Sequence, residues 1–558
     1  MIQPTPAIVA QDAVRRLPRW ALALLCVAYV LPGFVAREPW KTQDMAAFGY
    51  MFELARGATS WFSPRILGLA PEFEALLPYW LGAWAIRLTP GWMEVDFAAR
   101  VPFIGLLALT LAATWWAIYH LARRPLAQPV AFAFGGEASP RDYARSLADA
   151  GLLALVATLG LAQFAHETTP ALAQLGFAAL AFYGLAALPG RDVWPAVAVA
   201  AGLPGLALSG APSLALAIGL GGAALMLLAD PSEDTGRRRR WAWAAFVAAC
   251  AMAATAIASS LDLWHWRLGA PRNLRSDTRL LVWFTWPAWP LALWTLWRWR
   301  RQLASRHVAL PLWIALACTV SAMATPIGAR SLMLALPAYA ALAAFALPTL
   351  RRSVAALIDW FTLLFFSAGA LVIWVVWLSL QTGIPAKPAA NVARLAPGFE
   401  PSFSVLAFAT ALAATLAWAL LVRWRVGRHR SALWKSLVMP AGGATLCWLL
   451  LMTLWLPVLD YARSYVPSVR GVLRAVEGTG CIEVAGLTRA QMAALAYHGG
   501  LTLQLATQAG AAPACTWRVV GAEAGAATAS DLRHWQLADT VRRPTDARDT
   551  LRIYRVRP

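Results

Sequence analysis

Four carboxylates stand together in one segment of an otherwise apolar chain. Residues 37–80 follow the first apolar run and carry Asp44, Glu53, Glu72 and Glu74. A carboxylate can take the proton from an attacking hydroxyl group, or orient that group, as a general base. Because acids are rare within the apolar runs, we interpret this cluster as a candidate reaction site. Acids that merely face water in an outer loop are the alternative.

Further ionisable side chains lie at the predicted outer ends of the apolar runs and in the loops between them. Arginines there suit the recognition of a phosphate, since the forked guanidinium group matches phosphate oxygens. Contacts with lipid phosphates, and a helix-capping role for His166, are the alternatives. The acid Asp359 is the main exception to this outer placement. Ion-coupled transporters keep ionisable groups near the membrane midplane, so the outer placement seen here is unlike theirs. The candidates are His166, Glu167, His265, Arg267, Arg272, Arg275 and Arg330.

The composition predicts a helical membrane protein with many spans. Of 558 residues, 59% are hydrophobic and 14% are charged, whereas a soluble chain carries about 25% charged residues. Apolar runs of roughly 17 to 25 residues recur along the chain, which is the length that crosses a bilayer. The net charge of +20 comes in short basic clusters between the runs, the positive-inside pattern, so no nucleic-acid partner is expected.

We expect about thirteen transmembrane helices, beginning with an uncleaved first helix and a cytoplasmic N-terminus. The loop 37–100 is then outside, and residues 76–89 within it are predicted to form a helix that lies in the interface. Asp149 is expected to open the third span. The predicted spans lie near 20–36, 101–121, 149–165, 171–188, 193–210, 212–230, 241–261, 279–297, 308–324, 331–350, 353–378, 404–421 and 434–456.

The tail, residues 457–558, has ordinary polarity and predicts a small outer α/β domain that follows the transmembrane domain 1–456. The runs CIEVAG, TWRVVG and LRIYRVR are strand-like, and RAQMAALAYHGG is helical. Cys481 and Cys515 lie in this tail, and outside the membrane the compartment is oxidising, which favours a disulfide between them. Two free thiols are the alternative.

The first outer loop resembles that of the C-type polytopic glycosyltransferases (GT-C), in particular the protein O-mannosyltransferase and lipid A aminoarabinose transferase group. Those proteins carry an acid just after the first span, an aromatic, proline and glycine at set distances from it, and thirteen spans with an outer C-terminal domain. Here the second acid is missing beside Asp44, and Ala47-Phe48 replaces an Arg-Tyr pair. A Lys-Pro-Pro run is replaced by Ala75-Leu76-Leu77. The matching residues are Asp44, Trp61, Pro64, Arg65, Gly68, Glu74 and Pro78-Tyr79-Trp80.

The resemblance also implies roles for individual residues. Asp44 would be the catalytic base or the carboxylate that orients the acceptor. Glu74 and Glu167 would shape the acceptor and sugar sites, and Arg330 would meet the lipid phosphate. Some relatives bind a divalent metal ion near the Glu and a later His, which makes Glu74 and His265 candidate metal ligands. The expected substrate-binding residues are Arg65, Glu74, Tyr79, His166, Glu167, Arg267, Arg272, Arg275 and Arg330.

By this resemblance the chain is expected to be an inverting glycosyltransferase of the bacterial inner membrane. It would take a sugar from a polyprenyl-phosphate carrier and pass it, at the periplasmic face, to a lipid A-like or other envelope acceptor. A flippase or transporter for a lipid-linked sugar is one alternative, and it predicts polar residues along a path through the spans. A non-catalytic envelope-assembly scaffold is the other: the loss of Lys-Pro-Pro leaves it open, whereas the intact spacing from Asp44 to Gly68 argues against it.

Overall fold

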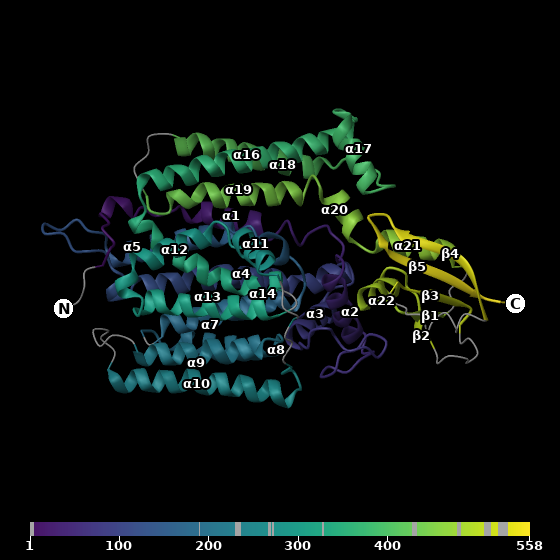
Figure 1. Ribbon diagram of the computed structural model, residues 1–558, viewed down its shortest axis with the longest axis horizontal. Helices are drawn as coiled ribbons and strands as arrows, with labels where there is room; N and C mark the ends of the chain where they lie inside the picture. The colour runs from purple at the N-terminus through teal and green to yellow at the C-terminus, as the bar shows by residue number, and fades with distance from the viewer. Residues whose placement is uncertain are drawn as a thin grey trace.

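The computed structural model describes most of the chain, in ten segments. A long bundle of parallel and antiparallel helices occupies one part of the molecule, and a small sheet domain caps one end of it (Figure 1). The N-terminal residues lie at the opposite end of the bundle. The described segments are residues 5–188, 190–228, 236–265, 269, 273–325, 328–426, 432–476, 481–506, 515–522 and 534–557.

The bundle is built from helices whose ends are set by prolines, glycines and capping side chains. α5 begins at Pro140, where Ser139 caps the helix by accepting a hydrogen bond from the backbone N–H of Asp142. The elements are η1 (Gln11–Ala13), α1 (Arg19–Val30), α2 (Gln43–Ala55), α3 (Leu77–Leu88), α4 (Val95–Ala122), η2 (Pro125–Ala127), α5 (Pro140–Ala157), α6 (Leu161–Phe164), α7 (Pro170–Ala187), α8 (Val193–Leu208), α9 (Pro212–Leu228), α10 (Arg237–Ser260), α11 (Leu274–Phe284), α12 (Ala288–Arg298), η3 (Arg300–Gln302), α13 (Arg306–Ala324), α14 (Gly328–Leu332), η4 (Met333–Ala335), α15 (Leu336–Ala346), η5 (Leu347–Thr349), α16 (Arg352–Thr382), α17 (Ala386–Leu395), α18 (Val405–Val426), α19 (Lys435–Leu451), α20 (Leu456–Arg463) and α21 (Val466–Ala475).

The predicted polytopic helical fold is confirmed. Among the described residues, seven helices are long and apolar enough to cross a membrane. If the bent pair α19 and α20 is counted as one span, the number is eight. The other predicted spans fall on α1, α5, α8, α9, α11 and α12, of which α1, α8 and α9 are shorter apolar helices. The N-terminal end of α10 and the C-terminal end of α18 lie at the same end of the bundle, away from the sheet domain (Figure 1). Their arginines therefore share one side, as the predicted number of crossings requires.

Three predicted boundaries are wrong. α5 begins at Pro140 rather than at Asp149, whose carboxylate is buried and accepts a hydrogen bond from Trp115 Nε1 (2.8 Å). α1 ends at Val30, just before Pro32, which cannot continue the backbone hydrogen bonds. α4 starts at Val95, ahead of the predicted 101.

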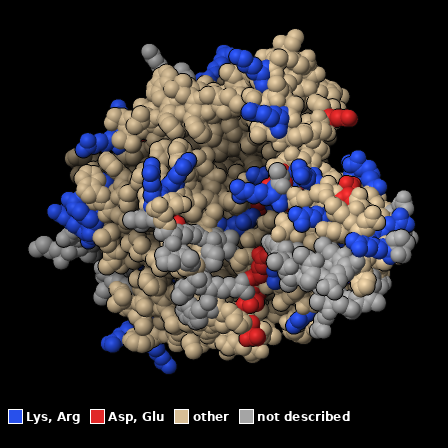
Figure 2. Space-filling view, turned by 45° about the vertical axis from the view of Figure 1, so that its right-hand side comes forward, with Lys and Arg blue, Asp and Glu red and all other residues tan. Residues whose placement is uncertain are grey.

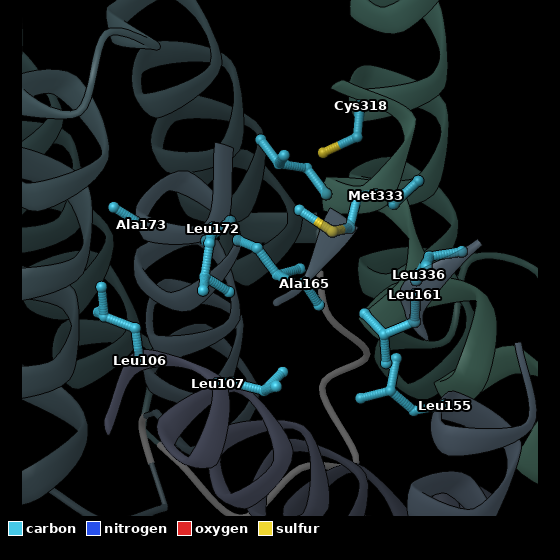
Figure 3. Close-up of a cluster of buried hydrophobic side chains, with 14 of the residues drawn as sticks. Leu106, Leu107, Leu155, Leu161, Ala165, Leu172, Ala173, Cys318, Met333 and Leu336 are labelled. Carbon is cyan, nitrogen blue, oxygen red and sulfur yellow. The ribbon is translucent and has the colours of Figure 1, made fainter. Parts of the chain in front are cut away.

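Small and branched apolar side chains fill the centre of the bundle. Figure 3 shows Leu106 and Leu107 of α4 near Leu172 and Ala173 of α7, with Met333 on the opposite side of the cluster. All of these are buried. Alanines on α4, α5, α7 and α15 let the helices approach closely, as is usual where packing rather than hydrophobicity drives association within lipid. The result is a rigid scaffold behind the segment that carries the candidate site.

The tail forms the predicted small α/β domain. Its sheet has the order β2-β1-β3-β5-β4, in which β1 is parallel to β2 and β3, and β5 is antiparallel to β3 and β4. The predicted strand runs and helix are found, and β2 and β4 are additional. The elements are β1 (Ile482–Ala485), α22 (Arg489–Tyr497), β2 (Leu503–Leu505), β3 (Trp517–Val520), β4 (Trp535–Arg543) and β5 (Asp546–Val556).

The C-terminal α/β domain packs against the first outer segment of the chain. α2 packs against α22 so closely that a Cβ on Gly49 would lie 2.5 Å from Cβ of Ala493. Trp40 forms a β-bridge with Ser464. Lys41 Nζ pairs with a carboxylate oxygen of Asp546 at 2.9 Å. The segment that carries the candidate site is therefore held by residues from the far end of the chain.

A disulfide joins Cys481 to Cys515 across a sequence separation of 34 residues. Replacing both cysteines with serine is expected to destabilise the C-terminal domain by about 3–4 kcal/mol, because a cross-link of this loop length restricts the unfolded chain. Thermal unfolding of the purified protein, monitored by proteolysis of the tail, measures the change in stability. A double Cys26/Cys250 serine variant, which removes two free thiols, is the control, and an equal loss in both variants would contradict the prediction.

Candidate active site

Asp44 is buried at the start of α2, and all of its acceptor positions are used. Its side chain is 1% exposed. One carboxylate oxygen accepts from Arg37 Nη1 (2.8 Å) and from the backbone N–H of Trp40 (3.0 Å). The other accepts from the backbone N–H of Thr168 (2.7 Å) and from the Thr168 hydroxyl. An acid in the first turn of a helix is also stabilised by the helix dipole. Asp44 is therefore the centre of a closed network.

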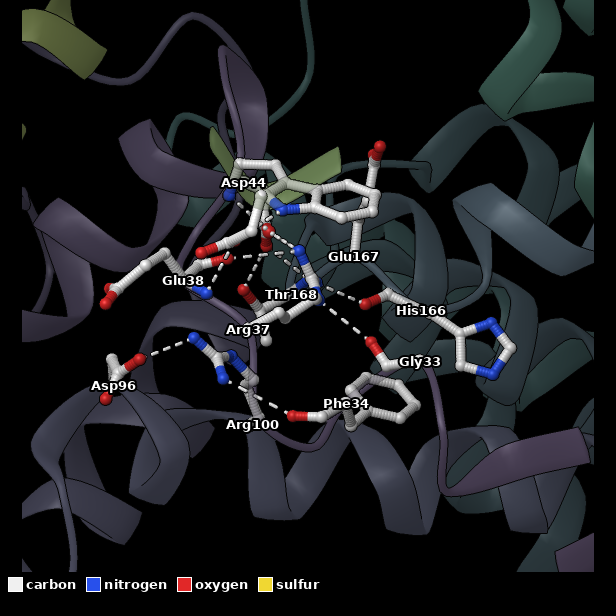
Figure 4. A network of polar contacts seen from close by, with 12 residues as sticks. Gly33, Phe34, Arg37, Glu38, Asp44, Asp96, Arg100, His166, Glu167 and Thr168 are labelled. Atoms are coloured by element: carbon white, nitrogen blue, oxygen red, sulfur yellow. Dashed lines mark hydrogen bonds and ion pairs between the residues drawn. The ribbon is translucent and has the colours of Figure 1, made fainter. Parts of the chain in front are cut away.

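Arg37 connects this carboxylate to three backbone carbonyls. Its Nε donates to the carbonyl of Gly33 (2.8 Å), and its Nη2 donates to the carbonyl of His166 (2.6 Å). A longer contact reaches the carbonyl of Glu38 (3.4 Å). The guanidinium also lies over the ring of Trp40, 4.7 Å from its centroid. Figure 4 shows how these groups converge from the segment after α1 and the segment before α7.

Residues 166–168, between α6 and α7, are the junction of the site. Thr168 faces Asp44, and the carbonyl of His166 faces Arg37. The ring of His166 points away from Asp44 (Figure 4), and its nitrogens lie against the carbonyls of Tyr29 (3.0 Å) and Ala162. Burial lowers the pKa of His166 to about 4. His166 thus takes part through its backbone, and its ring serves packing.

Glu167 points to the other side of this junction and binds Arg330. One Glu167 carboxylate oxygen accepts from Arg330 Nε (2.9 Å) and Nη2 (2.7 Å). The Glu167 side chain is 3% exposed and the Arg330 side chain is 18% exposed. Arg330 comes from α14 and lies over the ring of Phe164. The pair places one arginine partly open to solvent beside the Asp44 network, as recognition of an anion requires.

Burial and ion pairing act against each other on the two carboxylates. Burial alone would raise the pKa of Asp44, but Arg37, Thr168 and Trp40 together hold it below its usual value. Burial also raises the pKa of Glu167, and the attraction of Arg330 does not offset it. Asp44 is consequently the carboxylate that stays ionised, and Glu167 is the one that binds a proton more readily.

A second group of charges borders the network on the α4 side. Arg100 Nη2 donates to Asp96 (2.6 Å), and Arg100 Nη1 donates to the carbonyl of Phe34 (3.3 Å). Asp460 accepts from the backbone N–H of Glu38 (3.0 Å) and from Trp40 Nε1 (3.0 Å). These bonds fix the segment after α1 against α4 and α20.

Glu38 is the partly exposed acid of this border. Burial, with Asp96 and Asp460 nearby, raises the pKa of Glu38 from 4.5 to about 7. The folded state then holds the proton more tightly than the unfolded chain between these values, so the contribution of Glu38 to the free energy of unfolding falls as pH rises through 7. We expect Glu38→Gln to remove this dependence, so that the wild type loses stability relative to the variant between pH 5 and about 8. Thermal unfolding of both proteins across that range tests it, and parallel curves would contradict it.

The structure places the predicted site residues in different surroundings. Asp44, His166, Glu167 and Arg330 come together in the network. Arg65 and Tyr79 instead hold their own loop: Arg65 Nη1 donates to the carbonyl of Gly68 (3.0 Å), and the Tyr79 hydroxyl donates to that of Phe73 (3.3 Å). Arg275 is exposed on α11 and has no recorded contact with the network among the described residues. Arg267 and Arg272 lie outside the described residues.

The predicted metal ligands Glu74 and His265 are adjacent. A carboxylate oxygen of Glu74 lies 2.7 Å from His265 Nδ1. The other ring nitrogen faces Asp262 at 3.6 Å, on the opposite side of the imidazole. Within the described segments, no group of three or more His, Cys, Asp or Glu converges on a point that could hold a metal ion. This part of the chain therefore supplies a contact between a carboxylate and an imidazole but not three converging ligands.

The sequence reasoning missed Arg37, Thr168 and the Asp96–Arg100 pair. Arg37 follows the first apolar run, where an arginine usually anchors a helix at the membrane surface. The spacing of Asp96 and Arg100, four residues apart, is the signal that would have extended α4 and paired them. Thr168 gives no such signal, because its neighbours in the sequence are far from Asp44 and only the fold brings them together.

Gly33 makes room for the ring of His166. A Cβ on Gly33 would lie 2.3 Å from His166 Cδ2 and 2.6 Å from Trp448 Cζ2. Gly33→Ala is therefore expected to cost about 1–3 kcal/mol of stability through overpacking, and to displace the carbonyls that hold Arg37. Thermal unfolding measures the cost. Gly105→Ala is the control, because a Cβ there meets nothing within 4 Å, and equal effects of the two substitutions would refute the argument.

The face that carries the sheet domain has a hollow (Figure 2). Figure 2 shows basic side chains along the margin of this hollow and a run of acidic side chains beside it. Positive and negative groups of this kind can neutralise a phosphate and orient a hydroxyl group within one space. The rest of the visible surface of the bundle is mainly uncharged.

Two solved structures are similar to the whole chain. The structure of ArnT from Cupriavidus metallidurans bound to undecaprenyl phosphate matches with a TM-score of 0.60 and 15% identity, over 96% of this chain and 98% of that chain. The structure of ArnT from the same organism in the apo state matches with a TM-score of 0.57 and 14% identity, over 96% of both chains. No family model and no curated protein matches. The chain thus has the fold of ArnT, the polytopic architecture expected for the C-type membrane glycosyltransferases, from its first helix to its C-terminal domain.

Proposed function

We propose that this protein is a membrane glycosyltransferase that takes a sugar from a polyprenyl-phosphate carrier. The observation that carries the proposal is the full-length similarity to ArnT, one of whose structures holds undecaprenyl phosphate. The similarity covers the bundle and the C-terminal domain together. The charged network around Asp44 lies where these two parts meet, so the fold and the candidate chemistry point to one site.

The proposed reaction occurs at the periplasmic face of the inner membrane. The N-terminus would be cytoplasmic, and residues 457–558 would form a periplasmic domain beside the transmembrane domain 1–456. Basic clusters at the end of the bundle opposite the sheet domain support this orientation. The acceptor would be a lipid A-like molecule or another envelope glycan, and a single displacement at the anomeric carbon would invert its configuration.

Asp44 is proposed to act on the acceptor hydroxyl. To accept a proton or a new hydrogen bond, Asp44 must give up one of its present donors. The Thr168 hydroxyl is the donor that can turn away, because the other three are a guanidinium and two backbone N–H groups fixed by the fold. An acceptor hydroxyl that replaced it would lie against an ionised carboxylate, which is the arrangement a general base needs.

Arg330 is proposed to bind the phosphate of the leaving carrier. Its guanidinium is partly exposed beside the network, and Glu167 fixes its orientation. When the bond between the anomeric carbon and the phosphate oxygen breaks, negative charge develops on the phosphate of the leaving carrier, and a preset arginine stabilises that charge. Glu74, with His265, would shape the neighbouring part of the substrate cleft. They line a groove with Gln174, Ser321 and Thr325.

A flippase for the same lipid-linked sugar is the second candidate, since it shares the carrier. The experiment that separates the two uses purified protein in liposomes with a radiolabelled polyprenyl-phosphate sugar and an envelope lipid extract. Label that moves from the carrier to an acceptor supports the transferase. Carrier that crosses the bilayer with its sugar still attached, without transfer, would overturn it.

A further inference from the structure

A groove on the bundle joins a basic pocket to an apolar channel. The pocket is lined by Arg16, Arg19 and Arg145, with Asp149, Trp115 and Trp116. The channel runs between α1 and α4 and shares Arg19, Leu22, Trp115 and Trp116 with the pocket. The pocket lies at the end of α1 and α5 opposite the sheet domain (Figure 1), and the channel extends from it along α1 to Val30 and Leu31.

The charges of the pocket suit an anion. Arg16 is held by Asp142 at 3.1 Å, Arg145 interacts electrostatically with Asp149, and Arg19 forms no ion pair with another described residue. The acid Asp149 is only 4% exposed and accepts a hydrogen bond from Trp115 Nε1 (2.8 Å). The outer surface of the pocket is therefore dominated by guanidinium groups, which bind phosphate oxygens well.

The channel suits a hydrocarbon chain. Its floor is formed by the small exposed side chains of Ala108 and Ala112, which are one helical turn apart on α4. Leu22, Cys26 and Val27 of α1 form one wall. The 12 residues of α1 span about 18 Å at 1.5 Å per residue, which is close to half of the roughly 30 Å hydrocarbon core of a bilayer. One acyl chain within one leaflet would fill it.

Tryptophans mark the depth at which the pocket and the channel meet. Trp116 is 44% exposed, and Trp20, next to Arg19, is 73% exposed. Tryptophan side chains concentrate at the level of the lipid headgroups. The arginines therefore lie at headgroup depth, and the channel extends from them into the hydrocarbon. A basic pocket between transmembrane helices, continuous with an apolar channel, has the form of a lipid-binding site.

We propose that this groove binds an anionic phospholipid, with its phosphate at Arg16, Arg19 and Arg145 and one acyl chain between α1 and α4. The site belongs to the leaflet opposite the candidate active site and is independent of the proposed transfer reaction. A bound lipid would join α1, α4 and α5, the three helices that support the segment carrying Arg37 and Asp44.

The test is native mass spectrometry of the delipidated full-length protein titrated with phosphatidylglycerol or phosphatidylcholine. The wild type is expected to retain phosphatidylglycerol preferentially. Arg16→Gln/Arg19→Gln/Arg145→Gln is expected to lose the preference, at about fivefold per arginine, the contribution of one basic residue near an anionic surface. Arg237→Gln/Arg238→Gln/Arg423→Gln, at the same end of the bundle but outside the groove, is the matched control and should keep it.

A second variant tests the channel without removing charge. Ala108→Phe/Ala112→Phe fills the channel and is expected to lose phosphatidylglycerol as the arginine variant does. Glycerol 1-phosphate, which has the headgroup phosphate but no acyl chain, should neither bind nor compete. The proposal is overturned if the control triple variant loses as much lipid as the groove variant. It is also overturned if filling the channel changes nothing, or if glycerol 1-phosphate displaces the lipid.

Discussion

Asp44→Asn is expected to lower sugar transfer by at least about 100-fold. The substitution keeps the shape of the side chain but removes the charge that Arg37 needs, and a buried ion pair that loses one partner costs about 3–5 kcal/mol. The amide also places an N–H₂ group against donors, because Trp40, Thr168 and Arg37 all donate to the carboxylate. Transfer of label from a polyprenyl-phosphate sugar by reconstituted protein measures the effect.

Two comparisons make this result specific. Asp192→Asn removes an ion pair with Arg239 whose side chains are both 49% exposed, and it should leave transfer unchanged. Arg37→Gln/Asp44→Asn removes both buried charges and should be more stable to heat than Asp44→Asn alone, since neither partner is then left buried and uncompensated. Full activity in Asp44→Asn would eliminate Asp44 from the reaction, and Glu167 or Glu38 would then be the carboxylate to test.

Arg330→Gln is expected to reduce kcat/KM for the lipid-linked donor by about 10- to 150-fold, the value of one charge-assisted hydrogen bond of 1.5–3 kcal/mol. Arg330→Lys should restore little of it, because a lysine cannot reproduce the two parallel N–H donors that the guanidinium presents. Steady-state kinetics with varied donor and fixed acceptor give the value. The KM for the acceptor should change much less.

The comparison for Arg330 is another arginine near the first outer segment. Arg56, at the end of α2, has a side chain that is 53% exposed and lies 3.8 Å from Glu53. Arg56→Gln should leave the donor kinetics unchanged, because a surface ion pair of this length contributes little. If Arg330→Gln raised the KM for the acceptor instead of the donor, Arg330 would belong to the acceptor side of the site.

The sequence was sufficient to predict the fold because its signals are local. Apolar runs of membrane-spanning length, basic clusters between them and the strand-like runs of the tail each depend on a few neighbouring residues. The misplaced start of α5 has a different cause, a buried polar residue. Asp149 was interpreted as the edge of a span, yet the fold supplies Trp115 as its partner. A single sequence does not reveal such a partner, so the start of α5 was misplaced.

The candidate site was predicted in part for the same reason. Asp44 and Glu167 stood out as acids beside apolar runs, and the structure brings both to one junction. The partner of Asp44 was missed because Thr168 lies 124 positions away, and a threonine beside a helix start is ordinary. His166 was selected for its ring, but its backbone carbonyl makes the contact with Arg37. Any residue type supplies a backbone carbonyl, so composition and spacing do not indicate which residue binds Arg37 in this way.

The attachment of the first outer segment to the tail also sets when the site can be completed during synthesis. Trp40 depends on Asp460, which is 420 positions later, and Lys41 depends on Asp546, which is 505 positions later. At about 5–20 residues per second, the ribosome needs roughly 25 to 100 s to make the intervening chain. During that time the segment with Arg37 and Asp44 lacks its contacts with the C-terminal part of the chain. The nascent protein therefore lacks a complete candidate site until the C-terminal domain with Asp460 and Asp546 has been made.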